Sequence, residues 1–115
     1  MREFQFQATS EHLDDATRIV RVSGELDLYT APEFERALSL NGDASGRFVV
    51  DLSECTFIDS TGLGILVAAH RRNGGSALLI VTSGLEVSRA FDVSGLDRHV
   101  TLHSNLASAL EGAVA

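Results

Sequence analysis

Two hydroxyl side chains follow a carboxylate in residues 57–64, whose sequence is FIDSTGLG. Asp59 precedes Ser60 and Thr61, and a helical pattern of apolar residues begins directly afterwards. One chemistry open to this turn is helix capping, because Asp and Ser side chains accept hydrogen bonds from the free N–H groups of a first helical turn. Another is phosphorylation, since the N-terminus of a helix stabilises a phosphate. The residues alone leave both readings open.

Two glycines, Gly62 and Gly64, fall inside the helical pattern that follows. Each costs about 1 kcal/mol relative to alanine in a helix interior. Their presence suggests that something approaches the helix backbone closely. A helix that starts at the carboxyl end of a central strand is also where α/β sheets place functional groups.

Other chemistries lack support in the sequence. There is no dinucleotide fingerprint, phosphate-binding loop or nucleophile elbow. The histidines are His12, His70, His99 and His103, and they lack the spacing of metal ligands. We therefore expect no metal site and no enzyme activity. An enzyme with Ser60 as nucleophile would need a base within hydrogen-bond reach, and no motif identifies one.

Composition narrows the class of protein further. The 115 residues suit one compact domain spanning residues 1–115, and 44% hydrophobic with 22% charged residues is typical of a globular chain. The lone cysteine, Cys55, is expected to be a small buried hydrophobic residue. The net charge of −7 argues against nucleic acid or an anionic membrane as partner. No apolar run reaches the roughly 20 residues of a membrane span, so we expect a cytoplasmic protein.

The first half of the chain reads as a hairpin, a helix and a strand. Residues 4–8 and 18–24 have strand patterns, and a loop over residues 9–16 would make them antiparallel. Thr30 and Glu33 have the spacing of a capping box, which predicts a helix that buries Phe34, Ala37 and Leu38 and ends at Asn41 and Gly42. The nearly continuous apolar run at residues 48–52 predicts a strand covered on both faces.

The second half alternates helices and strands. The helix after Ser60 carries Leu63, Leu66, Val67 and His70 on one apolar stripe and would end at residues 73–75, with His70 near its C-terminal end. Strands are predicted at residues 77–81 and 100–102. Ser83 with Glu86 predicts a capping box for a helix that ends at Gly95.

A last helix, capped by Ser104, would bury Leu106 and Leu110. The predicted order is β-β-α-β-α-β-α-β-α, an α/β fold. Its mixed sheet would have four to five strands and about four helices, with right-handed crossovers in the parallel portion. The first hairpin would add an antiparallel edge.

The segment FIDSTGLG resembles the signature of the STAS family, named after sulfate transporters and anti-sigma factor antagonists. Three further segments resemble family elements in the right order: VSGELD followed by TAP at residues 22–32, FVVDLS at 48–53 and FDVSGL at 91–96. The resemblance covers most of the chain. It implies the STAS fold.

The resemblance is strongest to single-domain bacterial anti-sigma factor antagonists. It implies that the protein binds an anti-sigma factor, which releases a sigma factor for transcription. In that group the anti-sigma factor is also a serine kinase, so ATP and Mg²⁺ would belong to the partner and this chain would hold no cofactor. The kinase would phosphorylate Ser60, and a PP2C-type phosphatase would restore the active form. The implied partner-binding residues are Asp27, Asp59, Ser60, Thr61, Gly62 and Leu63.

An alternative stays open within the same fold. The chain could be a STAS scaffold or a transporter-associated module without phosphoregulation. Ser60 favours the regulated class, because the switch needs a hydroxyl at that position.

Overall fold

A computed structural model describes residues 6–39, 47–72, 78–82, 84–98 and 100–114. This part of the chain forms a five-stranded sheet in which the strand order follows the chain order, β1-β2-β3-β4-β5. β1 pairs with β2 antiparallel, and the other neighbours are parallel. The elements are β1 (Gln7–Asp14), β2 (Thr17–Leu26), α1 (Ala31–Ser39), β3 (Arg47–Ile58), α2 (Ser60–Arg72), β4 (Leu78–Val81), α3 (Leu85–Ser94), the 3-10 turn η1 (Leu96–Arg98), β5 (Thr101–His103) and α4 (Leu106–Val114). The predicted element order and the antiparallel edge are confirmed, and η1 is an addition.

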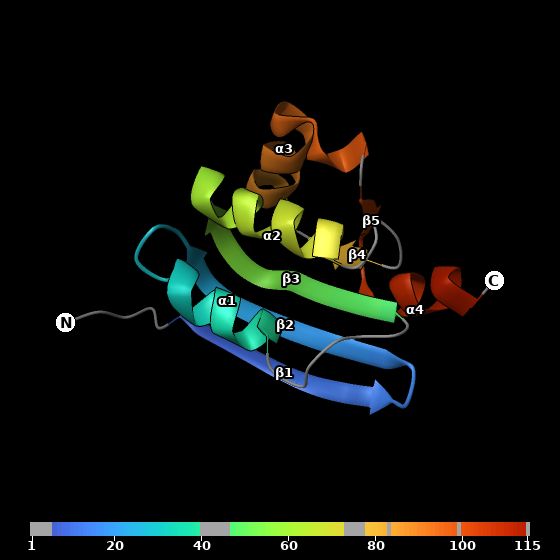
Figure 1. Cartoon of the computed structure of the whole chain (residues 1–115). Helices are drawn as coiled ribbons and strands as arrows, with labels where there is room; N and C mark the ends of the chain where they lie inside the picture. The colour runs from blue at the N-terminus through green and yellow to red at the C-terminus, as the bar shows by residue number, and fades with distance from the viewer. Residues whose placement is uncertain (1–5, 40–46, 73–77, 83, 99, 115) are drawn as a thin grey trace.

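The helices divide between the two faces of the sheet (Figure 1). α1, α2 and α3 cover one face and share the larger hydrophobic cluster, in which Phe34, Leu66 and Phe91 are fully buried. α4 covers the other face, where Ala109 packs in a smaller cluster with residues of β2, β3 and β4. None of the helices in the described ranges is long and apolar enough to cross a membrane.

The hairpin differs from its prediction in length. The expected loop over residues 9–16 was wrong, because β1 continues to Asp14 and pairs with β2 along that stretch. Most of these residues are exposed, which explains why a polar sequence can form this edge strand. The N–H of Ala16 donates to Asp14 Oδ1 at 2.8 Å and lowers the pKa of that carboxyl. Phe6 and Ala8 pack against the core, and residues 4 and 5 of the predicted first strand lie outside the described ranges.

β3 is much longer than the predicted strand at residues 48–52. Its pairing with β2 shifts register twice, so the buried side chains Leu52, Cys55 and Ile58 recur every third residue instead of every second. That irregular period hid the second half of the strand. Gly24 of β2 lies at one of these shifts with φ of 92°, a conformation that favours glycine. Cys55 is buried as predicted, and burial raises the pKa of its thiol.

The predicted helix caps need correction. The Thr30 hydroxyl accepts from the N–H of Asp27 at 2.9 Å and donates to the Glu25 carbonyl at 2.8 Å, so it does not form the predicted capping box with Glu33. The N-cap of α3 is Gly84, which has no side-chain cap, in place of the Ser83–Glu86 box; Ser83 itself lies outside the described residues. Gly95 ends α3 as expected, with φ of 80°.

The cap of α4 is one residue later than predicted. Asn105, in place of Ser104, accepts a hydrogen bond from the N–H of Ser108 at 2.7 Å. Leu106 and Leu110 pack against the smaller cluster, in agreement with the prediction. The predicted helix ends at residues 41–42 and 73–75 lie outside the described ranges.

The buried face of α2 is also rotated from its prediction. Gly62, Leu66 and Ala69 form the buried line, whereas Leu63 and Val67 are only half-buried. His70 is likewise half-buried. The rotation follows from Gly62, since a position without a side chain lets the helix backbone lie directly on the sheet.

Candidate functional site

The candidate site lies where β2 and β3 end side by side. Leu26 pairs with Ile58 in the parallel register, so Asp27 and Asp59 follow two neighbouring strands at the same edge of the sheet. The N–H of Asp59 donates to the Leu26 carbonyl at 3.2 Å. This hydrogen bond ties the turn after β3 to the turn after β2.

Asp59 is the N-cap of α2. Its Oδ1 accepts hydrogen bonds from the N–H groups of Thr61 at 2.9 Å and of Gly62 at 3.2 Å. Ser60 is the first helical residue, and it is exposed. Among the hydrogen bonds of the described residues, none engages the Ser60 hydroxyl. Asp59 is therefore the residue that caps the helix. Ser60 takes no part in the cap and stays exposed at the start of the helix.

Asp27 holds the neighbouring turn in a similar way. Its Oδ1 accepts from the N–H groups of Tyr29 at 3.0 Å and of Thr30 at 3.1 Å, while its own N–H donates to the Thr30 hydroxyl at 2.9 Å. The turn presents Leu28 and Tyr29 to solvent, with 62% and 88% of their surfaces exposed. Neither Leu28 nor Tyr29 was among the predicted site residues. Two large apolar side chains inside a polar turn were the signal that could have found them.

The remaining predicted site residues differ in accessibility. Asp27, Asp59, Thr61 and Leu63 are half-buried, and Gly62 is buried. A Cβ at Gly62 would lie 2.8 Å from Leu26 Cγ and 2.9 Å from Ile58 Cγ1. The close approach that the sequence suggested for this glycine therefore comes from within the fold.

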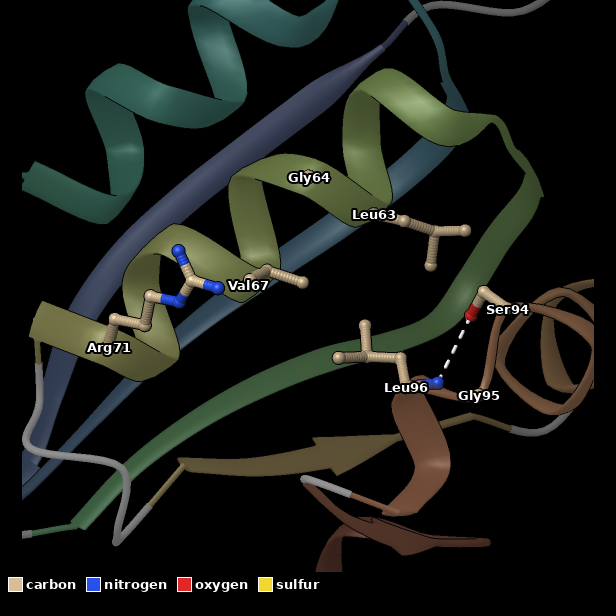
Figure 2. A pocket seen from close by; sticks show the side chains of 7 residues that line it. All are labelled: Leu63, Gly64, Val67, Arg71, Ser94, Gly95 and Leu96. Atoms are coloured by element: carbon tan, nitrogen blue, oxygen red, sulfur yellow. Dashed lines mark hydrogen bonds between the residues drawn. The ribbon is translucent and has the colours of Figure 1, made fainter.

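A groove opens on the far side of α2 from Gly62. It has a volume of about 290 Å³ and is lined by Leu63, Gly64, Val67, Arg71, Ser94, Gly95 and Leu96. Figure 2 shows Leu63 and Val67 pointing from α2 towards the end of α3 and the start of η1, with Arg71 further along the same helix. Leu63 is one turn from Ser60, so the groove begins next to the exposed hydroxyl.

Neither a metal cluster nor a catalytic pair stands out in the described ranges. No group of three or more His, Cys, Asp and Glu side chains there could hold a metal ion. The His103 imidazole contacts the Ser108 hydroxyl through Nδ1 at 3.2 Å, and no hydrogen bond in those ranges joins a histidine to Ser60. His99 lies outside the described residues.

The fold and this turn define a class of α/β protein in which a capped helix presents a hydroxyl at the end of the central strand. The STAS domain family matches residues 7–109, and the chain belongs to that family. The resemblance inferred from residues 57–64 is thereby confirmed.

Relatives and solved structures support the assignment. The chain is 34% identical over 90 residues to the anti-sigma-B factor antagonist of Listeria monocytogenes, covering 76% of this chain and 75% of that protein. It is similar to the crystal structure of an anti-sigma factor antagonist from Mycobacterium paratuberculosis, at 32% identity, a TM-score of 0.87 and coverage of 96% of each chain.

The same fold occurs in a larger protein of another kind. The murine anion transporter Slc26a9 matches 95% of this chain and only 22% of its own length, with a TM-score of 0.74 and 14% identity. A likeness at that identity shows the fold alone. The fold by itself therefore does not separate an antagonist from a transporter module.

Proposed function

We propose that the protein is an anti-sigma factor antagonist that binds an anti-sigma factor kinase and is released when Ser60 is phosphorylated. Release of the sigma factor would follow from the binding. The observation that carries the proposal is the exposed Ser60 hydroxyl on the first turn of α2, next to two carboxylates that their own turns hold in place. The names of the relatives at 32–34% identity support the same function.

Ser60 would act as the phosphoryl acceptor and the partner as the enzyme. The Ser60 oxygen forms a bond to the γ-phosphorus of ATP, the bond to the bridging oxygen breaks, and ADP leaves. The hydroxyl proton passes to a base of the kinase. A PP2C-type phosphatase would return the serine by hydrolysis.

Charge explains why one modification can end the binding. A phosphate adds about −1.5 to −2 charges at neutral pH. The positive end of the α2 dipole tolerates this charge within the free protein. A partner surface that fits a neutral hydroxyl beside Asp59, at the sheet edge shared with Asp27, would instead meet concentrated negative charge. The switch therefore needs no refolding, only a change of charge at the interface.

Intact-mass measurement after incubation with a candidate anti-sigma factor kinase, ATP and Mg²⁺ tests the proposal. We expect the wild type to gain one phosphate, Thr61→Ala to gain one as well, and Ser60→Ala to gain none. We further expect Ser60→Asp to bind the kinase at least about tenfold more weakly than the wild type. Equal binding of Ser60→Asp would contradict the electrostatic account.

A STAS module without phosphoregulation is the second candidate. Its support is the shared fold of the anion transporter, which extends over nearly the whole described chain. An active kinase that binds the protein and transfers no phosphate would make this candidate the better one. Asp59, Ser60 and Thr61 would then serve as a cap and a contact surface.

A further inference from the structure

Gly64 is a helix-interior glycine that the fold itself does not require. A Cβ at this position would meet no atom within 4 Å outside its own neighbourhood, and the backbone is not in the left-handed region. Alanine would fit and would favour the helix. The described neighbours of Gly64 therefore give no packing reason for a glycine at this position.

The groove beside Gly64 is built from two walls. Leu63, Val67 and Arg71 recur every fourth residue and form one stripe of α2. Residues 94–96, where α3 ends and η1 begins, form the other wall (Figure 2). α2 packs more closely against α1 than against α3, which leaves this space open.

The two polar side chains of the groove, Ser94 and Arg71, differ in their hydrogen bonding within the described chain. The Ser94 hydroxyl donates to the Phe91 carbonyl at 3.1 Å and accepts from the N–H of Leu96 at 3.2 Å, so its hydrogen bonds are made within the chain. Arg71 is exposed, and the ion pair found in the described ranges joins Arg21 to Glu11 instead. The groove thus offers apolar walls, a bare stretch of helix and one cation at its end.

These features define the occupant by its chemistry. An apolar side chain would fill the space against Gly64, and a carboxylate on the same segment would pair with Arg71. A second copy of this chain fits less well, because two molecules of net charge −7 repel each other.

We propose that the groove receives an apolar side chain of the anti-sigma factor, packed on the α2 backbone at Gly64, with an acidic residue of the partner paired to Arg71. This inference rests on the proposed function. It extends the contact surface from Ser60 along α2 through Leu63. The groove contacts use Leu63, Val67 and Arg71 rather than the Ser60 hydroxyl, so the groove contributes affinity of its own beside the contact at Ser60.

Titration calorimetry with a candidate anti-sigma factor kinase tests the groove. Gly64→Leu fills the space, and we expect it to bind at least about tenfold more weakly than the wild type. Ala107→Leu adds the same side chain at an exposed position of α4, on the opposite face of the sheet, and should stay within about twofold of the wild type.

A matched pair of charge reversals tests the cation. Arg71→Glu should weaken binding by about fivefold or more, whereas Arg72→Glu, which changes the net charge equally outside the groove, should stay within about twofold. The unfolding midpoint of Gly64→Leu should equal or exceed that of the wild type, which separates lost binding from lost folding.

The outcomes distinguish the two proposals. If Ser60→Asp weakens binding and Gly64→Leu does not, the groove proposal is wrong and the proposed function stands. If Gly64→Leu abolishes self-association of the free protein and leaves kinase binding intact, the occupant is a second copy and the proposal is overturned. If the wild type neither binds an anti-sigma factor nor gains phosphate, both proposals fail.

Discussion

Gly62 and Gly64 lie two residues apart on α2 and face opposite surroundings. At Gly62 a methyl group would overlap buried atoms of Leu26 and Ile58 on the sheet below. At Gly64 the same methyl group would enter the open groove. One glycine is required by packing inside the molecule, and the other is not.

The difference shows that a helix-interior glycine has no single explanation. The sequence assigns both positions the same loss of helix propensity and the same conformational freedom. Contacts with other strands and helices decide whether the glycine is needed for packing inside the molecule or lies at an open surface. Gly62 lies at the contact between α2 and the sheet, and Gly64 lines the groove.

Replacing Gly62 should give the largest effect. Gly62→Ala forces Leu26 and Ile58 to move within a filled core, so we expect the free energy of unfolding to fall by about 2 kcal/mol. Chemical denaturation monitored by circular dichroism measures the change. An unchanged unfolding midpoint would show that α2 can lift from the sheet at no cost, and the contrast between the two glycines would disappear.

Removing the cap of the same helix should have an intermediate effect. Asp59→Ala leaves the N–H groups of Thr61 and Gly62 without their acceptor, and we expect a loss of about 1 kcal/mol in unfolding free energy. Asp59→Asn is the matched control, because Asn caps a helix about as well as Asp. Equal losses for the two variants would mean that the charge of Asp59, rather than its capping bonds, stabilises the turn.

Replacing Gly64 should give the smallest effect, and one of opposite sign. Gly64→Ala adds a methyl group in open space and favours the helix, so we expect the unfolding free energy to rise by somewhat less than 1 kcal/mol. The same denaturation experiment gives the answer. A decrease would reveal a packing requirement at Gly64 and would remove the reason to look for a partner there.

The sequence predicts strands and helices well where their apolar residues follow a regular spacing. Apolar runs and helical periods predicted the five strands and four α-helices in the right order, although not the short turn η1. The prediction was poorest for β1 and β3. The polar residues of β1 suit an edge strand, and the register shifts of β3 break the period that marks a strand.

The candidate site likewise has features that adjacent residues predict and features that depend on packing between distant segments. Asp59 and Ser60 could be placed at the start of a helix from the adjacent residues alone. The exposure of Leu28 and Tyr29, and the groove beside Gly64, could not be predicted. They depend on how separate elements pack together, and that information is not local in the chain.

The division of the helices between the two faces has a consequence for synthesis of the protein. Because each strand joins beside the one made before it, the sheet can grow at its edge while the chain leaves the ribosome. Among the described helices, α4 alone covers the face that carries Ile19, Val49, Leu79 and Val81, and α4 follows all five strands. A nascent chain that has completed β5 therefore shows this apolar face to its surroundings, and its solubility at that stage depends on how soon α4 is made.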